Sequence, residues 1–114
     1  MSKIIDSIVR SGNRTSVDFI GKNLYDALCF GFSYIESEDH FVNYIVANSR
    51  NIKKIFAEIS DSSVKISEDS VGELWMAKLL ISEKLRDKHI MFSNNTLSII
   101  INLNLNPYKE FDIA

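Results

Sequence analysis

The sequence has few of the residues that build metal centres and disulfides: one cysteine, Cys29, and two histidines, His40 and His89. A lone cysteine cannot form an internal disulfide, so nothing indicates an oxidising compartment. Zinc sites usually draw on closely spaced cysteines and histidines, and these three residues are far apart along the chain. We therefore expect no metal and no cofactor.

An excess of charge of one sign is also lacking, because 13 basic residues face 15 acidic ones and the formal net charge is -2. Proteins that recognise nucleic acid usually carry a basic face, and polybasic segments attract membrane surfaces. No apolar run approaches the roughly 18 residues that cross a bilayer, and residues 1–10 do not resemble a signal peptide. We expect neither specific nucleic-acid binding nor membrane binding, and no secretion.

Glycine and proline are scarce, with four and one respectively, and no low-complexity linker is present. The glycines match neither the dinucleotide-binding pattern nor the phosphate-binding loop. With 114 residues, 46% hydrophobic and 25% charged, the chain has the size and composition of one globular domain. We expect a single domain over residues 1–114, with residues 1–14 as a loose lead-in.

Two segments have the apolar spacing of helices. Residues 15–37 place apolar side chains on one stripe, with Thr15 as the N-cap; these are Ile20, Leu24, Ala27, Leu28 and Ile35. Gly21 and Gly31 interrupt that stripe, which predicts close packing against a neighbour. Residues 49–59 form the second predicted helix, capped by Asn48-Ser49.

Four segments are rich in β-branched and aromatic residues and are predicted strands: residues 41–47, 73–82, 89–93 and 96–103. Asn94-Asn95 suits a turn, and Asn106-Pro107 would end the last strand. Residues 60–72 are polar and predict a surface excursion with at most a short strand. The order predicts an α+β domain in which two helices cover a small, mainly antiparallel or mixed sheet of about four strands.

The polar residues form no recognisable catalytic group. Cys29 lies between Leu28 and Phe30 and is predicted to be a small buried hydrophobe. His40 near Glu38 and Asp39 motivates a small enzyme as one hypothesis, but a catalytic base needs an oriented partner and a pocket. We expect no enzyme, no catalytic residue and no small-molecule substrate.

The predicted helix 15–37 carries aromatic residues off its main stripe: Phe19, Phe30, Phe32 and Tyr34. A helix that is apolar nearly all round is buried on more than one side. A second hypothesis is therefore a stand-alone protein-binding module, of prophage origin, that holds a partner with this helix.

Residues 71–82, Val-Gly-Glu-Leu-Trp-Met-Ala-Lys-Leu-Leu-Ile-Ser, resemble the G-x-LWGA-x-I-x-VS segment of tailed-bacteriophage major capsid proteins, whose Hong Kong-type fold also builds encapsulin shells. The charged link 83–88 with the strands after it, and the run from Ile35 to Ile59, are also similar to that family. Met76 stands where the family often has glycine. The matching core positions are Gly72, Leu74, Trp75, Ala77, Ile81 and Ser82.

The resemblance covers residues 15–105 and implies the axial domain of a capsid subunit; the family's spine helix, extended loop and N-terminal arm have no counterpart. It implies a structural protein that associates with copies of itself or with other capsid subunits, in a virion or in the host cytoplasm. The predicted contacts lie in segments 60–72 and 83–88, at Ser62, Ser63, Lys65, Glu68, Asp69, Lys84, Arg86 and Asp87.

Overall fold

The computed structural model describes residues 14–37, 40–67, 69–94 and 97–105 of the chain. The expectations for residues 1–13, Glu38, Asp39, Glu68, Asn95 and Asn106-Pro107 lie outside the described residues. The elements are β1 (Arg14–Gly21), α2 (Leu24–Glu36), β2 (Tyr44–Ala47), α3 (Ser49–Glu58), β3 (Ser62–Val64), β4 (Gly72–Leu74), β5 (Ala77–Ile81), β6 (His89–Ser93) and β7 (Ser98–Leu105).

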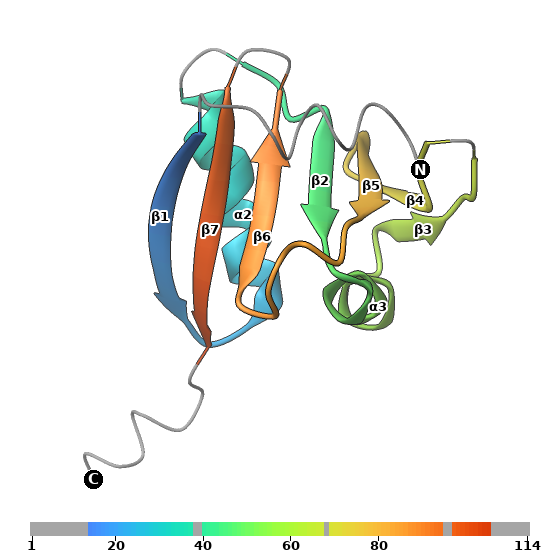
Figure 1. Ribbon diagram of the computed structural model, residues 1–114, viewed down its shortest axis with the longest axis horizontal. Coiled ribbons are helices and arrows are strands. Elements are labelled where there is room, and N and C mark those ends of the chain that lie inside the picture. The colour runs from blue at the N-terminus through green and yellow to red at the C-terminus, as the bar shows by residue number, and fades with distance from the viewer. Residues whose placement is uncertain (1–13, 38–39, 68, 95–96, 106–114) are drawn as a thin grey trace, which may run out of the picture.

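The strands form one mixed sheet in the order β1-β7-β6-β2-β5-β4-β3 (Figure 1). The pairs β1–β7 and β2–β5 are parallel, and the other four pairs are antiparallel. Both helices pack on the same face of the sheet, since their buried side chains share one apolar cluster with the strands. The α+β prediction is confirmed, but the sheet has seven strands rather than about four.

The predicted helix 15–37 is wrong in its first part, where residues 14–21 form strand β1. Val17 and Phe19 of β1 pack against the core, whereas Ile20 of the same strand is 70% exposed. This alternation has the period of two that a strand requires. The helix begins at Leu24, and its N-cap is Asn23, whose Oδ1 accepts a hydrogen bond of 2.8 Å from the backbone N–H of Asp26.

The predicted strand 73–82 is a hairpin, with β4 and β5 joined by a two-residue turn at Trp75 and Met76. Both residues have positive φ, 48° for Trp75 and 73° for Met76. Tight hairpin turns need this left-handed conformation, and glycine or asparagine usually supplies it. The turn was missed because the sequence has neither residue there.

The remaining elements agree more closely with the sequence pattern. Helix α3 begins directly after its predicted cap, Asn48, and β6 has the predicted bounds 89–93. Strand β2 is shorter than residues 41–47, and β7 is displaced toward the C-terminus relative to residues 96–103. These differences are the usual uncertainty of element ends.

The core lies between the helices and the sheet. Gly31 of α2 faces the Phe92 ring of β6, and a Cβ added there would lie 2.5 Å from ring atoms. The close packing predicted for Gly31 is therefore confirmed. On the opposite face, Val46, Leu80 and Met91 form a smaller buried cluster with Leu85 of the 83–88 connection.

Candidate interaction surface

Strand β3 lies at one edge of the sheet and has only three residues, Ser62–Val64. The hydroxyl of Ser62 donates a hydrogen bond of 2.6 Å to the carbonyl oxygen of Ile59, just after α3. Ser62 thus joins helix to strand, whereas Ser63 is exposed. Of the two predicted contact residues, Ser63 is the more available to a partner.

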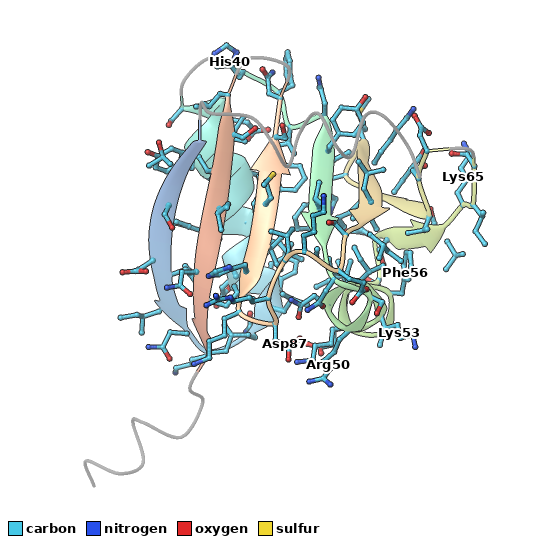
Figure 2. All side chains as sticks on the ribbon, in the orientation of Figure 1. His40, Arg50, Lys53, Phe56, Lys65 and Asp87 are labelled. Atoms are coloured by element: carbon cyan, nitrogen blue, oxygen red, sulfur yellow. The ribbon has the colours of Figure 1, made fainter. Side chains whose placement is uncertain are left out.

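Two apolar side chains at this edge are exposed to solvent: Val64 is 64% exposed and Ile66 is 80% exposed. Two ion pairs lie near the same edge of the sheet, with Lys65 Nζ 3.6 Å from Glu73 Oε1 and Lys78 Nζ 3.7 Å from Asp69 Oδ2. Figure 2 shows Lys65 projecting at this end of the molecule. We call this set the β3-edge patch; it combines exposed apolar side chains with charged neighbours, as protein interfaces do.

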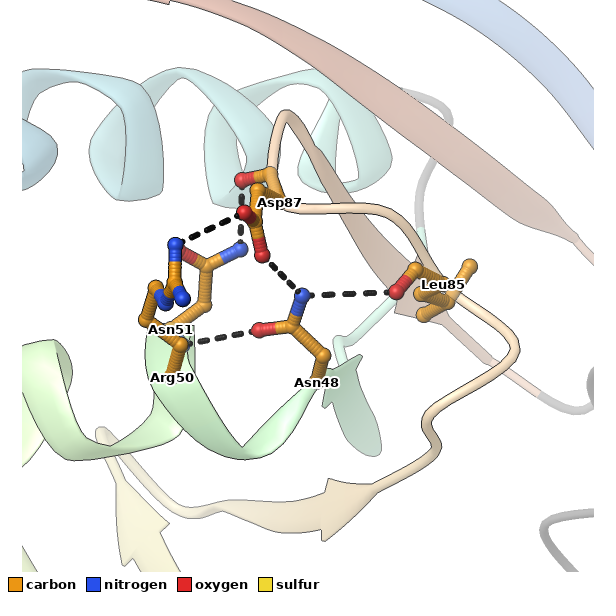
Figure 3. Close-up of polar contacts among 5 residues, drawn as sticks. All are labelled: Asn48, Arg50, Asn51, Leu85 and Asp87. Atoms are coloured by element: carbon orange, nitrogen blue, oxygen red, sulfur yellow. Dashed lines mark hydrogen bonds and ion pairs between the residues drawn. The ribbon is translucent and has the colours of Figure 1, made fainter.

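The second predicted contact segment, 83–88, is bound to the start of α3 through Asp87 (Figure 3). Asn48 Nδ2 donates to Asp87 Oδ1 at 2.7 Å, and Arg50 Nη1 donates to Asp87 Oδ2 at 2.9 Å. Asn51 Nδ2 donates to the Asp87 carbonyl oxygen at 2.8 Å. The carboxylate predicted to meet a partner therefore has partners inside the chain.

Asn48 is the centre of this polar network. Its Oδ1 accepts from the backbone N–H of Asn51 at 2.9 Å, which caps α3, and its Nδ2 also approaches the Leu85 carbonyl oxygen at 3.4 Å. Glu83 Oε1 accepts from the backbone N–H of Ser49 at 2.8 Å. Since an acidic group stabilises a helix N-terminus, the connection both caps α3 and fixes its own course.

The six positions of the capsid-like segment are mostly interior. Gly72 and Ser82 are buried, and Ile81 is half-buried. Leu74 and Ala77 have no exposed surface. A Cβ at Gly72 would collide with the Ser63 carbonyl oxygen and the Phe56 ring. The segment therefore builds the β4–β5 hairpin and its packing rather than a surface.

Trp75, in the hairpin turn, packs between the edges of Tyr25 and Phe32 of α2, at ring-centroid distances of 5.7 and 5.1 Å. Its Nε1–H donates to Asp61 Oδ2 at 3.1 Å. These contacts hold a bulky residue in a left-handed turn, which costs about 1–2 kcal/mol. The hairpin is thereby joined to both α2 and the end of α3.

The aromatic residues that motivated a partner-binding helix have neighbours within the chain. The Phe30 ring lies 5.4 Å from that of Phe19 and 6.4 Å from that of Tyr34. Phe32 also contacts Phe92, at 5.9 Å. The chain itself thus accounts for the second apolar side of α2.

Cys29 of α2 is half-buried rather than fully buried. A hydrogen bond with the Cys29 side chain raises the pKa of the Tyr25 hydroxyl above its ordinary value.

His40 is half-buried beyond the end of α2, where its backbone N–H donates to the Ile35 carbonyl oxygen at 3.3 Å. His89 begins β6, so the fold does not bring the two histidines together.

Within the described part of the chain, no group of three or more His, Cys, Asp or Glu side chains could hold a metal ion. Nor does any helix in that part have the length and apolar character to cross a membrane. No protein-family model, curated protein or solved structure matches the chain.

The network at Asn48 also produces a surface that sequence reasoning missed. It holds the 83–88 connection against α3, so that exposed cations of two segments lie at one end of the molecule; these are Arg50, Lys53, Lys54, Lys84, Arg86 and Lys88. We call this set the basic face. In the sequence, each segment contains a short run of basic residues. Only the fold brings the two runs together on one surface.

Proposed function

We propose that the protein is a structural protein that acts by self-association, as a phage- or prophage-derived domain of the major-capsid type. Its partners are copies of itself or related shell subunits, and the β3-edge patch is the contact. The observation that carries the proposal is the pair of exposed apolar side chains, Val64 and Ile66, at an edge of the sheet that also holds two ion pairs.

The backbone at Met76 supports the correspondence with the capsid family. Its φ of 73° lies in the region that favours glycine. The resembling capsid segment often has glycine at this place, between the tryptophan and the alanine. A methionine there is 95% exposed, so it occupies the position without a packing role among the described residues.

The patch predicts weak contacts between single pairs of copies. Fully burying a valine or isoleucine contributes about 1.5–3 kcal/mol, and association costs about 4–15 kcal/mol in lost freedom. Two such side chains on each of two copies contribute about 6–12 kcal/mol, which is comparable to that cost. Stable association therefore needs several contacts per copy, as in a closed ring or shell.

Sedimentation of the full chain tests this proposal. We expect the weight-average mass to rise as concentration increases from about 10 μM to about 1 mM, the range in which contacts of about 4–7 kcal/mol saturate. The variant Val64→Ser/Ile66→Ser should stay monomeric, because it removes the exposed apolar side chains and leaves the ion pairs in place.

A matched control is Met76→Ser, which removes an exposed apolar side chain outside the patch and should associate as the parent does. A parent chain that stays monomeric over the whole range contradicts self-association. Equal association by the parent and the double variant places the contact elsewhere and contradicts the role of the patch.

A further inference from the structure

The basic face carries a local excess of positive charge that the net charge of the whole chain does not reveal. Segments 49–58 and 83–88 together hold six basic and three acidic residues, a local excess of three positive charges in a chain whose formal net charge is -2. The remainder of the chain is correspondingly acidic. The molecule thus has a positive end, which attracts polyanions through its field.

The acidic residues within this face are largely occupied. Asp87 accepts hydrogen bonds from Asn48 and Arg50, and Glu83 accepts one from the backbone N–H of Ser49. Glu58 lies at the far end of α3. Glu83 also satisfies a backbone donor at the start of α3, so the cations rather than the helix terminus make this surface attractive to anions.

The lysines, in contrast, have no such partners. Among the described residues, the side chains of Lys53, Lys54 and Lys88 take part in no ion pair or hydrogen bond, and all three residues are exposed. The same holds for Lys84 and Arg86. Five cations at one end of a small domain therefore keep their full capacity to meet anionic groups.

Their arrangement fits an extended line of phosphates. Arg50, Lys53 and Lys54 follow the i, i+3, i+4 spacing that puts side chains on one face of a helix, and they line a shallow, open hollow on the surface of α3. Lys54 and Lys88 line an adjoining cavity of about 280 Å³ between α3, the connection and the end of β7. Lys54 and Glu58 belong to both hollows, so the two adjoin. The cations Arg50, Lys53, Lys54 and Lys88 outnumber the acidic residues Glu58 and Asp87 in their lining.

We propose that the basic face binds the phosphate backbone of double-stranded nucleic acid without sequence preference. A duplex presents about one negative charge for every 1.7 Å of its axis, which lysines scattered over two segments can meet in many registers. Among the described residues, no aromatic side chain lines either hollow, so these residues offer no platform for the base stacking that single strands require. The expected binding is electrostatic and non-specific, and it does not depend on self-association.

Fluorescence anisotropy with a labelled 20-base-pair DNA duplex of arbitrary sequence tests this inference. At about 50 mM NaCl we expect measurable binding that weakens steeply as NaCl is added, with equal affinity for a second, unrelated duplex. The variant Lys54→Gln/Lys88→Gln should weaken binding at least about tenfold and reduce the salt slope by about 2, one for each lost phosphate contact.

The matched control is Lys65→Gln/Lys78→Gln, which changes the net charge equally but lies in the β3-edge patch and should bind DNA within about twofold of the parent. Equal weakening by both variants would mean that only net charge matters, and no binding at low salt would end the inference. If Lys54→Gln/Lys88→Gln instead alters sedimentation of the protein alone without affecting DNA, the basic face contacts another copy and the nucleic-acid assignment is wrong.

Discussion

The buried side chain of Asn48 offers the sharpest test of how this fold holds together. Asn48 is 6% exposed, caps α3 through the backbone N–H of Asn51, and donates to Asp87 across a sequence separation of 39 residues. The substitution Asn48→Ala removes both bonds, together with the longer contact of 3.4 Å to the Leu85 carbonyl oxygen. It therefore loosens the start of α3 and the 83–88 connection together.

The magnitude follows from these two contacts. Losing an asparagine N-cap costs about 1 kcal/mol, and losing a hydrogen bond to a charged group costs about 1.5–3 kcal/mol. Because the Asp87 side chain is 58% exposed, water replaces part of the second contribution. We expect Asn48→Ala to lower the free energy of unfolding by about 2 kcal/mol, a large share of the 5–15 kcal/mol typical of a domain.

Urea unfolding followed by circular dichroism measures this change, with Asp87→Ala and the double variant completing a thermodynamic cycle. We expect a coupling of about 1 kcal/mol between Asn48 and Asp87, since each single change removes their shared bond. The control is Asn43→Ala, because the Asn43 side chain makes no hydrogen bond among the described residues. If Asn48→Ala costs no more than Asn43→Ala, the network does not stabilise the fold and the reasoning fails.

Two further outcomes concern the hairpin turn and α2. Met76→Gly should raise the free energy of unfolding by about 0.5–1 kcal/mol, because φ is 73° and the side chain is 95% exposed; a lower urea midpoint would contradict the strain at this turn. Cys29→Ala should lower the pKa of Tyr25 toward its ordinary value, because the Cys29 side chain is the main cause of its rise. A raised pKa in the folded state stabilises the fold below the unfolded pKa, and this contribution is lost as pH rises through the folded pKa. Tyrosine absorbance titration near 295 nm, with Tyr25→Phe to identify the signal, measures the shift, and an unchanged pKa in Cys29→Ala would assign it to another cause.

The misassigned strand β1 shows why a local pattern was insufficient. Residues 15–21 contain Thr, Val, Phe and Ile, which suit a strand, yet Ile20 also continues the helical stripe of Leu24 and Leu28. Short apolar runs are ambiguous between the two periods. Residues 15–21 form a strand because they pair with β7, which is distant in the sequence. Asp18 and Asn102, for example, are paired although they are 84 positions apart.

For the candidate surfaces as well, the sequence indicates some features, whereas others depend on the tertiary structure. The sequence pointed to segment 60–72 as exposed, and Ser63, Lys65 and Ile66 are indeed exposed. It could not indicate that Asp87 would be held by Asn48, or that the basic runs of α3 and the connection would meet. Such contacts depend on which segments become neighbours, and no local pattern encodes that.

By itself, the sequence determined the α+β class, helix α3 with its cap at Asn48, and strand β6, because caps and periodic apolar residues act over a few neighbouring positions. Only the tertiary structure decided that β1 is a strand, that Trp75 and Met76 turn the chain, and that cations of two distant segments share one face. The physical reason is that these features draw their stability from partners far along the chain: β7 for the edge strand, α2 and Asp61 for the turn, and the Asn48–Asp87 bond for the basic face.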